Sequence, residues 1–176
     1  MAQTSEILII GGGIIGLSIA RELRKSGVSD IAILERGTLG SEASSAAAGM
    51  LAPQAEADSA DLFFEFCRES CQLYPQFAVE LLDETGLDIE LDRTGTLYLG
   101  FNDADGEELL GRYSWQRDAG LAVESLSAAD ISKLEPNVSS KVRMGLLFPN
   151  DWQVENRRLV VALRRSTELS DIAIHE

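Results

Sequence analysis

The sequence predicts an α/β protein that begins with a βαβ unit, and three observations support that prediction. An apolar run over 7–10 is typical of a strand, and its lack of alternation predicts burial on both faces. After a glycine-rich turn, apolar residues recur at helical spacing from Ile14 until Gly27 ends the helix. A second apolar run over 31–34 follows at once. A strand, a helix and a strand in close succession favour a parallel pair joined by a crossover helix.

Three glycines between the first predicted strand and the helix form the pattern G-x-G-x-x-G, which is typical of dinucleotide-binding turns. Gly11 allows the tight turn, Gly13 leaves room for a pyrophosphate against bare backbone, and Gly16 lets the helix pack closely on the strand. Glu35 ends the second strand, where its carboxylate can accept hydrogen bonds from both ribose hydroxyls of an adenosine and would repel a 2′-phosphate. The pattern therefore predicts NAD or FAD rather than NADP, and its alternative is a glycine-rich turn that binds nothing.

The segment over 37–56, GTLGSEASSAAAGMLAPQAE, distinguishes between these two cofactors. An NAD-binding domain of this type continues into an ordinary amphipathic helix here, whereas this segment is almost all Gly, Ala and Ser. Small side chains let a backbone lie against a flat, bulky ligand, which favours FAD. Ser44 or Ser45 is expected to cap a helix that begins here. A flexible loop is the alternative, and the rigid Pro53 that follows so soon argues against it.

Four stretches together resemble the D-amino-acid oxidase family of FAD enzymes: IIGGGIIG in the glycine turn, Glu35, ASSAAAGMLAPQAE, and the later LLFPNDWQVENRRLVVAL. The resemblance covers nearly the whole chain and is strongest to the members that oxidise glycine in thiamine biosynthesis. The glycine turn is shared by many flavin and NAD enzymes, whereas the Ala/Ser stretch that ends in Gly-Met-Leu is narrower. The resemblance implies an oxidoreductase whose cofactor is FAD.

The resemblance also implies which residues line the FAD site. Beside Gly11, Gly13 and Gly16, it places there residues of the glycine turn, the end of the second strand and the Ala/Ser segment, namely Ile14, Ile15, Glu35, Arg36, Ala43, Ser44, Ala48, Gly49 and Met50. It implies oxidation of glycine or a similar small amino acid to the imine, with reduction of O2 to H2O2. In the family, the arginine that binds the substrate carboxylate and a second flavin segment come later in the chain. We therefore expect an N-terminal fragment that is inactive alone, and the sequence names no catalytic residue.

The middle of the chain predicts a smaller α+β domain. Apolar residues at helical spacing predict a helix over 61–84, which Pro75 is expected to kink or restart. Further elements follow from alternation or periodicity: strands over 88–92, 96–101 and 142–148, and helices over 103–118 and 127–136. Alternating strands of this kind indicate a mostly antiparallel sheet with one face exposed.

At the end of the chain, Asn156 is expected to cap a helix that runs through Arg165, and IAIHE begins another strand. The fold class is therefore α/β: a Rossmann-type βαβ domain with part of an inserted α+β domain, incomplete at its C-terminus. The predicted organisation is an FAD-binding domain over 1–85, part of a substrate-binding domain over 86–150, and a return to the FAD-binding domain over 151–176.

Composition and charge exclude several classes of protein. The formal net charge of −14 would repel nucleic acid and anionic membranes, and no apolar run is long enough to span a bilayer. Cys67 and Cys71 are joined by no further metal ligand, so we expect buried thiols, no metal and a reducing cytoplasm. His175, the only histidine, has no partner nearby in the sequence and is expected to be structural or exposed.

Two other functions stay open at this point. One is an NAD-dependent dehydrogenase of Rossmann type, and the other is a dinucleotide-binding module without catalysis. The expected partners are a small amino-acid substrate and O2, with a homo-oligomer also compatible with the sequence. No residue of the sequence identifies which amino acid is oxidised, or distinguishes an oxidase from a dehydrogenase.

Overall fold

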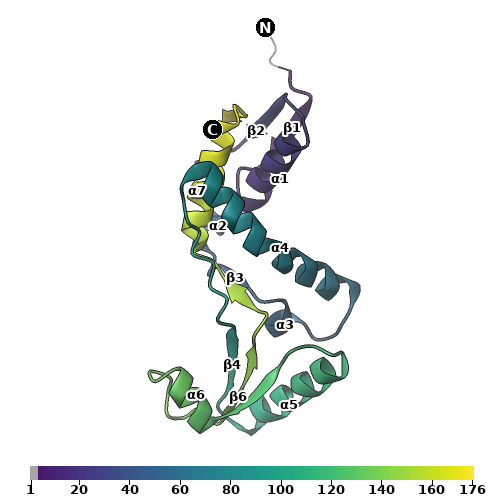
Figure 1. Ribbon diagram of the computed structural model, residues 1–176, viewed down its shortest axis with the longest axis vertical. Coiled ribbons are helices and arrows are strands. Elements are labelled where there is room, and N and C mark those ends of the chain that lie inside the picture. The colour runs from purple at the N-terminus through teal and green to yellow at the C-terminus, as the bar shows by residue number, and fades with distance from the viewer. Residues whose placement is uncertain (1–3) are drawn as a thin grey trace. The chain divides into compact units, whose positions relative to one another are not determined.

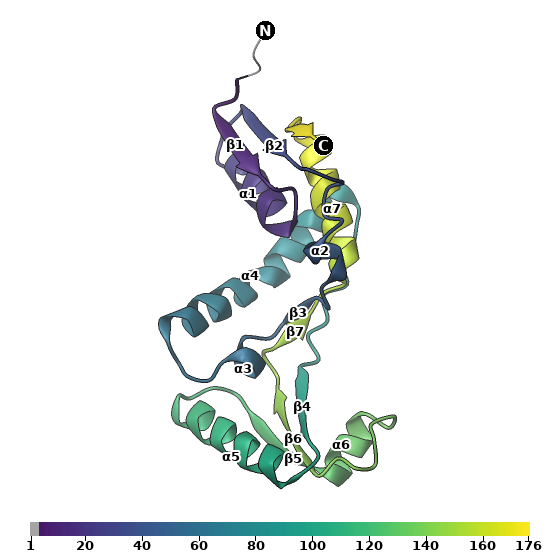
Figure 2. The same ribbon diagram turned by 180° about the vertical axis from the view of Figure 1, so that it is seen from behind.

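A computed structural model describes residues 4–176 and divides the chain into two compact units (Figures 1 and 2). Unit 1 contains the chain up to Gly49 together with Pro75–Leu91 and Val154–Glu176, and unit 2 contains Met50–Tyr74 and Asp92–Gln153. Each unit is thus assembled from segments that are far apart in the sequence. The functional division predicted above, into cofactor and substrate domains, stays a prediction.

Unit 1 is built on a parallel sheet in the order β1-β2-β8. Its elements are β1 (Ile7–Ile10), α1 (Ile14–Lys25), β2 (Ile31–Leu34), α2 (Ala43–Ala46), α7 (Asn156–Leu169) and β8 (Ala173–His175). The predicted βαβ unit is confirmed, because Ile7 pairs with Ile31 in parallel register on either side of α1 in the chain. Helix α1 covers one face of the β1–β2 pair, and its Leu17 is fully buried there (Figures 1 and 2).

The burial predicted for both faces of the strand over 7–10 is wrong in this structure. Leu8 is 54% exposed and Ile10 is 84% exposed, whereas Ile7 and Ile9 are half-buried. Both faces of a parallel strand are shielded from solvent only when a layer of structure covers each of them. Among residues 4–176, unit 1 supplies α1 to one face of β1, and the side chains on the other face stay in solvent.

A buried arginine joins three helices of unit 1. Arg21 on α1 is only 3% exposed, and its guanidinium donates to Glu22 at 2.7 Å, to Glu84 at 2.9 Å and to Glu80 at 3.3 Å. Ser166 on α7 donates its hydroxyl to Glu84 at 2.5 Å. Lys25 adds a second cation to Glu80 at 2.7 Å, and its bond, followed by those from Gln76 and Arg21, holds the pKa of the Glu80 carboxyl down at about 2. The network fixes α1 and α7 against the last turns of the long helix α4.

Unit 2 contains an antiparallel sheet in the order β4-β6-β5, as the alternating pattern predicts. Leu146 and Phe148 of its central strand are fully buried, and Leu109 and Val123 join them in the core. A short antiparallel pair, β3 with β7, forms a second ladder. The elements of the unit are β3 (Met50–Leu51), α3 (Pro53–Glu56), β4 (Thr96–Gly100), α5 (Asp103–Asp118), β5 (Glu124–Ser127), α6 (Ala128–Leu134), β6 (Met144–Phe148) and β7 (Trp152–Gln153).

Helix α4 (Leu62–Thr85) belongs to both units and runs without interruption through Pro75, so that of the predicted kink or restart the restart is wrong. A proline removes one backbone donor from the helical ladder, and the turns before and after it carry the helix across that position. The prediction of buried thiols holds for Cys71, which is 5% exposed, while Cys67 is half-buried. Within residues 4–176, no three His, Cys, Asp or Glu side chains are grouped so that they could hold a metal ion.

Two further predictions are corrected. The stretch 88–92 forms no strand and makes one isolated bridge, because Glu90 has a left-handed backbone with φ of 52° that an extended strand cannot continue. The cap of α7 is Glu155, whose carboxylate accepts from the amide of Arg158 at 2.6 Å, and not Asn156. Asn156 instead donates its side-chain amide to the carbonyl of Ser44 at 2.7 Å.

Candidate functional site

The glycine turn between β1 and α1 has the geometry that a phosphate group requires. Gly11 has a left-handed backbone with φ of 103°, and a Cβ atom built on it would meet nothing within 4 Å. A Cβ on Gly16 would lie 1.9 Å from the carbonyl oxygen of Gly11, so only glycine lets α1 pack this closely on the turn. These are the roles that the sequence assigns to the first and third glycines.

The start of α1 presents unused backbone donors. Gly13 is its N-terminal cap and makes no side-chain cap bond, and the first helical bond runs from Leu17 to the carbonyl of Gly13 at 3.0 Å. Among residues 4–176, the amides of Ile15 and Gly16 have no acceptor. Ile15 is also 77% exposed. Free amides and the positive end of the helix dipole together favour an anion such as a pyrophosphate at this position.

Ser44 does not cap α2, contrary to the prediction, and binds the start of α1 instead. Helix α2 begins after Glu42 and has no side-chain cap, and Ser45 donates its hydroxyl to the carbonyl of Ser41 at 2.9 Å. The hydroxyl of Ser44 instead accepts from the amide of Ile14 at 3.0 Å, in the first turn of α1. The Ala/Ser segment is therefore bound directly to the glycine turn, which the sequence pattern does not reveal.

Glu35 lies at the end of β2 beside the same turn. Its carboxylate accepts from the amide of Gly12 at 2.8 Å and from the amide of Gly37 at 3.0 Å. These two bonds, the one from Gly12 foremost, hold the pKa of Glu35 below its ordinary value, so the group is an anion at neutral pH. Its backbone amide donates to the carbonyl of His175 in β8 at 2.8 Å, which fixes the end of the strand.

The next two predicted residues have exposed side chains. The guanidinium of Arg36 forms an ion pair with Glu42 at 2.7 Å, and this arginine side chain is 82% exposed. Ala43, the first residue of α2, is also exposed. Their part in the site therefore stays a prediction that depends on the family resemblance alone.

Gly49 closes the Ala/Ser segment in a conformation that needs glycine. Its φ is 76°, its carbonyl accepts from the amide of Val154 at 2.9 Å, and a Cβ on it would lie 2.0 Å from the carbonyl oxygen of Val154. Ala48 before it is exposed. Met50, the next residue along the chain, begins β3 in unit 2 and is 51% exposed. The segment predicted to contact the cofactor is thus held at both of its ends.

Asn156 is a supporting residue that the sequence analysis places wrongly. Its bond to the carbonyl of Ser44 joins the first turn of α7 to the Ala/Ser segment, and the side chain is 7% exposed. The pattern at the start of a helix suggests a cap, because Asn is common at that position. Its true partner is 112 residues away in the sequence, so no local signal could have identified it.

The residues present fit a dinucleotide. Free amides at the start of α1 match phosphate oxygens, the open space at Gly11 leaves the backbone accessible, and the partly exposed anion of Glu35 can accept from ribose hydroxyls. These three features come from separate elements of unit 1 and converge on one turn. A metal ion has no comparable set of ligands within the described part of the chain.

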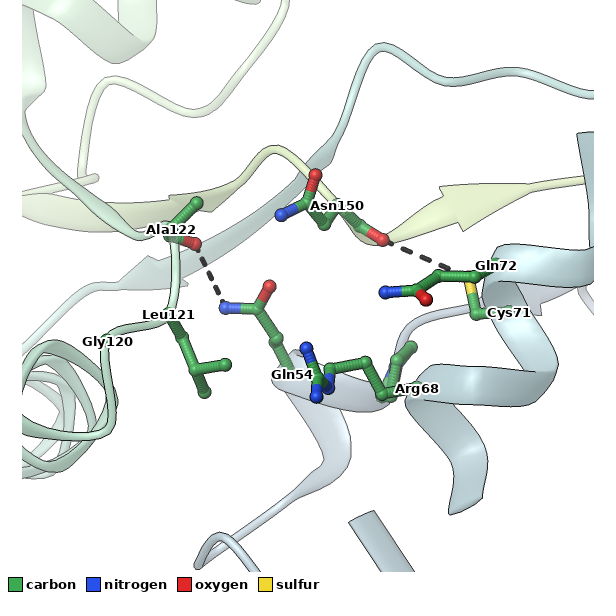
Figure 3. A pocket seen from close by; sticks show the side chains of 9 residues that line it. Gln54, Arg68, Cys71, Gln72, Gly120, Leu121, Ala122 and Asn150 are labelled. Atoms are coloured by element: carbon green, nitrogen blue, oxygen red, sulfur yellow. Dashed lines mark hydrogen bonds between the residues drawn. The ribbon is translucent and has the colours of Figure 1, made fainter. Parts of the chain in front are cut away.

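A separate pocket lies in unit 2 and contains none of the predicted site residues (Figure 3). Its volume is about 260 Å³, and it is lined by Pro53, Gln54, Arg68, Cys71, Gln72, Gly120, Leu121, Ala122 and Asn150. None of these residues is an acid or a histidine. Burial raises the pKa of the Cys71 thiol to about 11, so it stays protonated at neutral pH and is no nucleophile. The pocket therefore contains no group for proton transfer or covalent chemistry.

No helix within residues 4–176 combines the length and the apolar character that crossing a membrane requires.

Comparison with known proteins gives a consistent result. The family described as FAD-dependent oxidoreductases, DAO, matches residues 6–176. A glycine oxidase from Bacillus licheniformis is 38% identical over the whole chain, and the bifunctional protein ThiO/ThiG of Synechocystis is 36% identical. The crystal structure of glycine oxidase from Geobacillus kaustophilus superposes with a TM-score of 0.93 over 98% of the chain, at 33% identity. The chain covers 46% of both glycine oxidases and 25% of the bifunctional protein, and thus about half the length of the glycine oxidases that it matches.

Proposed function

The chain belongs to the family of FAD-dependent oxidoreductases, and on that premise we propose that the protein binds FAD at the glycine turn of unit 1 and oxidises glycine or a similar small amino acid. The family uses FAD, which decides the choice between FAD and NAD that Glu35 alone leaves open. The observation that carries the proposal is the convergence on one turn of the Glu35 carboxylate, held by two backbone amides, with the free amides of α1.

Each group of the turn has a definite task in this proposal. Glu35 accepts from the ribose hydroxyls of the adenosine, because its two bonds to the backbone use only part of its lone pairs. The amides of Ile15 and Gly16 donate to phosphate oxygens of the cofactor. Ser44 holds the Ala/Ser segment against the start of α1, so that Ala48 and Gly49 are presented along the cofactor.

When bound, FAD supplies the redox chemistry by accepting a hydride from the substrate carbon. The amino acid loses that hydride and a proton from nitrogen and becomes an imine, which water hydrolyses to an oxo acid and ammonia. O2 takes up the two electrons and two protons and becomes H2O2. The protein contributes orientation and exclusion of water, and the small, exposed side chain of Ala48 leaves space for a flat ring.

We assign the two units to different parts of this task. Unit 1 carries every predicted cofactor residue except Met50, which favours unit 1 as the FAD-binding part. Unit 2 supplies an antiparallel sheet and is proposed to belong to the substrate-binding part. The residues that bind the substrate carboxylate are expected in the half of the relatives that this chain does not cover.

The proposal is tested by the visible absorbance spectrum of the purified protein at its natural length, before and after addition of glycine without oxygen. We expect a flavin spectrum that glycine bleaches and that air restores, with formation of H2O2. A flavin spectrum that no small amino acid bleaches would overturn the proposed substrate class and leave the cofactor in place. Absence of flavin, even after incubation with added FAD, would overturn the proposed function as a whole.

A further inference from the structure

A carboxylate that sequence analysis overlooks is completely buried in unit 2. Asp151 is 0% exposed, and its two oxygens accept from the amides of Gln54 at 3.0 Å and Ala55 at 2.7 Å. Both donors belong to the first turn of α3, where Pro53 at the first helical position has no amide hydrogen to offer. Asp151 therefore accepts from the free donors at the start of this helix. It lies 97 residues after Gln54 and 96 residues after Ala55 in the chain.

Helix α3 depends on such external bonds, because a single helical turn is unstable by itself. A second attachment of α3 is a pair of neutral amides. The Gln54 side chain donates to Gln116 at 2.8 Å and to the carbonyl of Ala122 at 3.0 Å, and the Gln116 side chain donates back to the carbonyl of Gln54 at 2.9 Å (Figure 3 shows Gln54 and Ala122). The same turn is thus held by the Asp151 carboxylate, by this uncharged pair and by the guanidinium of Arg112, which donates to the carbonyl of Ala55 at 3.1 Å.

The strand next to α3 carries the last predicted cofactor residue. Only Ala52 separates β3 from α3, and Met50 and Leu51 pair with Gln153 and Trp152, the two residues that follow Asp151. The carboxylate and the β3–β7 ladder therefore hold one continuous segment. If α3 is released, β3 is held by the two residue pairs of the β3–β7 ladder and by the bond from the Cys71 thiol to the carbonyl of Leu51 at 3.6 Å.

We propose that Asp151 is a positioning residue, whose carboxylate fixes α3 and thereby keeps Met50 where it contacts the cofactor. The proposal rests on the proposed FAD site. Asp151 itself touches neither cofactor nor substrate, and it acts through the backbone of Gln54 and Ala55. A small acidic residue is required at this position because a carboxylate offers two acceptors at once, whereas an amide offers one acceptor and one donor.

The charge of Asp151 gives the proposal a readout that packing alone would not produce. Desolvation raises its pKa to about 6, against the two amide bonds that lower it, and the nearby Glu56 raises it further. The other titratable groups that face this region are Cys71, which stays neutral, Arg93, whose guanidinium lies 4.4 Å from the centre of the Trp152 ring, and Arg112, which donates to the carbonyl of Ala55 at 3.1 Å. Protonation converts one acceptor oxygen into a hydroxyl, and one of the two bonds to α3 is lost.

The test is the affinity of the flavin-free protein for FAD, measured by fluorescence titration between about pH 5 and about pH 8. We expect the dissociation constant of the unsubstituted protein to rise about tenfold as the pH falls through 6, because one bond to a charged acceptor is lost. Asp151→Asn should bind with the weakened constant throughout and show no step at that pH. Since burial disfavours the charged form of Asp151, the neutral asparagine is expected to fold.

The matched control is Gln116→Leu, which removes the neutral amide pair from the same turn and leaves the carboxylate intact. It is expected to retain the step in FAD affinity whatever its overall constant. If Asp151→Asn keeps both the affinity and the step of the unsubstituted protein, the positioning role is overturned. The role is likewise overturned if Gln116→Leu abolishes the step, because the pH effect would then not belong to Asp151.

A second measurement keeps the inference independent of the cofactor. Amide hydrogen exchange, corrected for intrinsic rates, should show protection at Gln54 and Ala55 that falls about tenfold in Asp151→Asn at neutral pH. Unchanged protection would overturn the proposal that the Asp151 carboxylate fixes α3. Loss of protection in a protein that binds no FAD at any pH would support the attachment of α3 by Asp151 and overturn the proposed function. Failure of the attachment and failure of the proposed function can therefore be told apart.

Discussion

Two carboxylates, one in each unit, accept the same kind of hydrogen bonds, yet their pKa values shift in opposite directions. Glu35 in unit 1 and Asp151 in unit 2 each accept from two backbone amides at 2.7–3.0 Å. The pKa of Glu35 is lowered, whereas that of Asp151 is raised to about 6. Glu35 is half-buried and Asp151 is fully buried. Desolvation therefore outweighs two amide bonds at Asp151 and is outweighed by them at Glu35.

The difference separates a binding group from a positioning group. A half-buried carboxylate keeps unused lone pairs in a place that a ligand can reach, which fits the proposed contact between Glu35 and a ribose. A buried carboxylate can serve only the protein around it, and its charge then raises the free energy of the folded state. The comparison predicts which substitutions should act on stability and which on the cofactor.

The largest loss of stability should come from disrupting the turn in which the amide of Gly12 donates to Glu35. In Gly16→Ala the new methyl group would lie 1.9 Å from the carbonyl oxygen of Gly11, and the backbone would have to move. We expect a loss of about 3 kcal/mol or more in the free energy of unfolding, measured by urea denaturation. Gly111→Ala is the control, since nothing lies within 4 Å of that position on α5 and alanine suits a helix interior. Equal effects of the two substitutions would contradict the close packing of α1 on the turn.

The second effect concerns the sign of the pH dependence. The pKa of Asp151 rises from 3.8 to about 6 on folding, so its contribution to stability is greatest at acid pH and is lost as the pH rises from about 4 to about 6. The loss is about 3 kcal/mol, from the size of that shift. The free energy of unfolding of Asp151→Asn should lack this fall. For Glu35 the lowered pKa gives the opposite sign, with stability present above about pH 4.5 and lost as the pH falls below it. A steeper fall in Asp151→Asn would contradict the burial of the charge.

Local patterns predict much of this fold, because the residues that decide them are neighbours in the chain. The strand over 31–34 and the helix over 103–118 have the predicted bounds, and the glycine turn occupies its predicted place between β1 and α1. The charge on Glu35 and its place at the end of a strand are likewise readable from the sequence. Each of these depends on spacing alone.

The failures share a different cause, which is contact between distant segments. Asp151 is buried and bound only because α3 packs against it. Ser44 reads as the cap of α2 and binds α1 instead. The burial predicted for both faces of β1 fails for the same reason, because burial of a strand depends on a covering layer that the strand's own sequence does not specify. Burial and long-range hydrogen bonds are therefore what the sequence leaves undetermined.

A third test extends the comparison to arginines of unit 1. Arg21 is 3% exposed and donates to three carboxylates, whereas Arg36 is 82% exposed and pairs with Glu42 alone. Arg21→Met should lower the free energy of unfolding by about 2 kcal/mol, because Glu80 and Glu84 lose a partner in a partly buried place. Arg36→Ala should cause no measurable loss in the same denaturation assay. If both substitutions were neutral, the buried network would contribute nothing to the packing of α1.

The smallest change in stability and the clearest change in binding are expected at Glu35 itself. Glu35→Gln keeps the shape of the side chain and one acceptor oxygen, so the turn should persist, with a loss of stability at neutral pH limited to the bond from one of the two amides, that of Gly12 or that of Gly37. Affinity for FAD should fall about tenfold, because a charged acceptor of hydroxyl groups is replaced by a neutral one. Glu42→Gln is the matched control, since that exposed carboxylate pairs with Arg36 and not with the turn. Should Glu35→Gln bind FAD as tightly as the control, the half-buried carboxylate would be structural like the buried one, and the contrast between the two units would lie in burial alone.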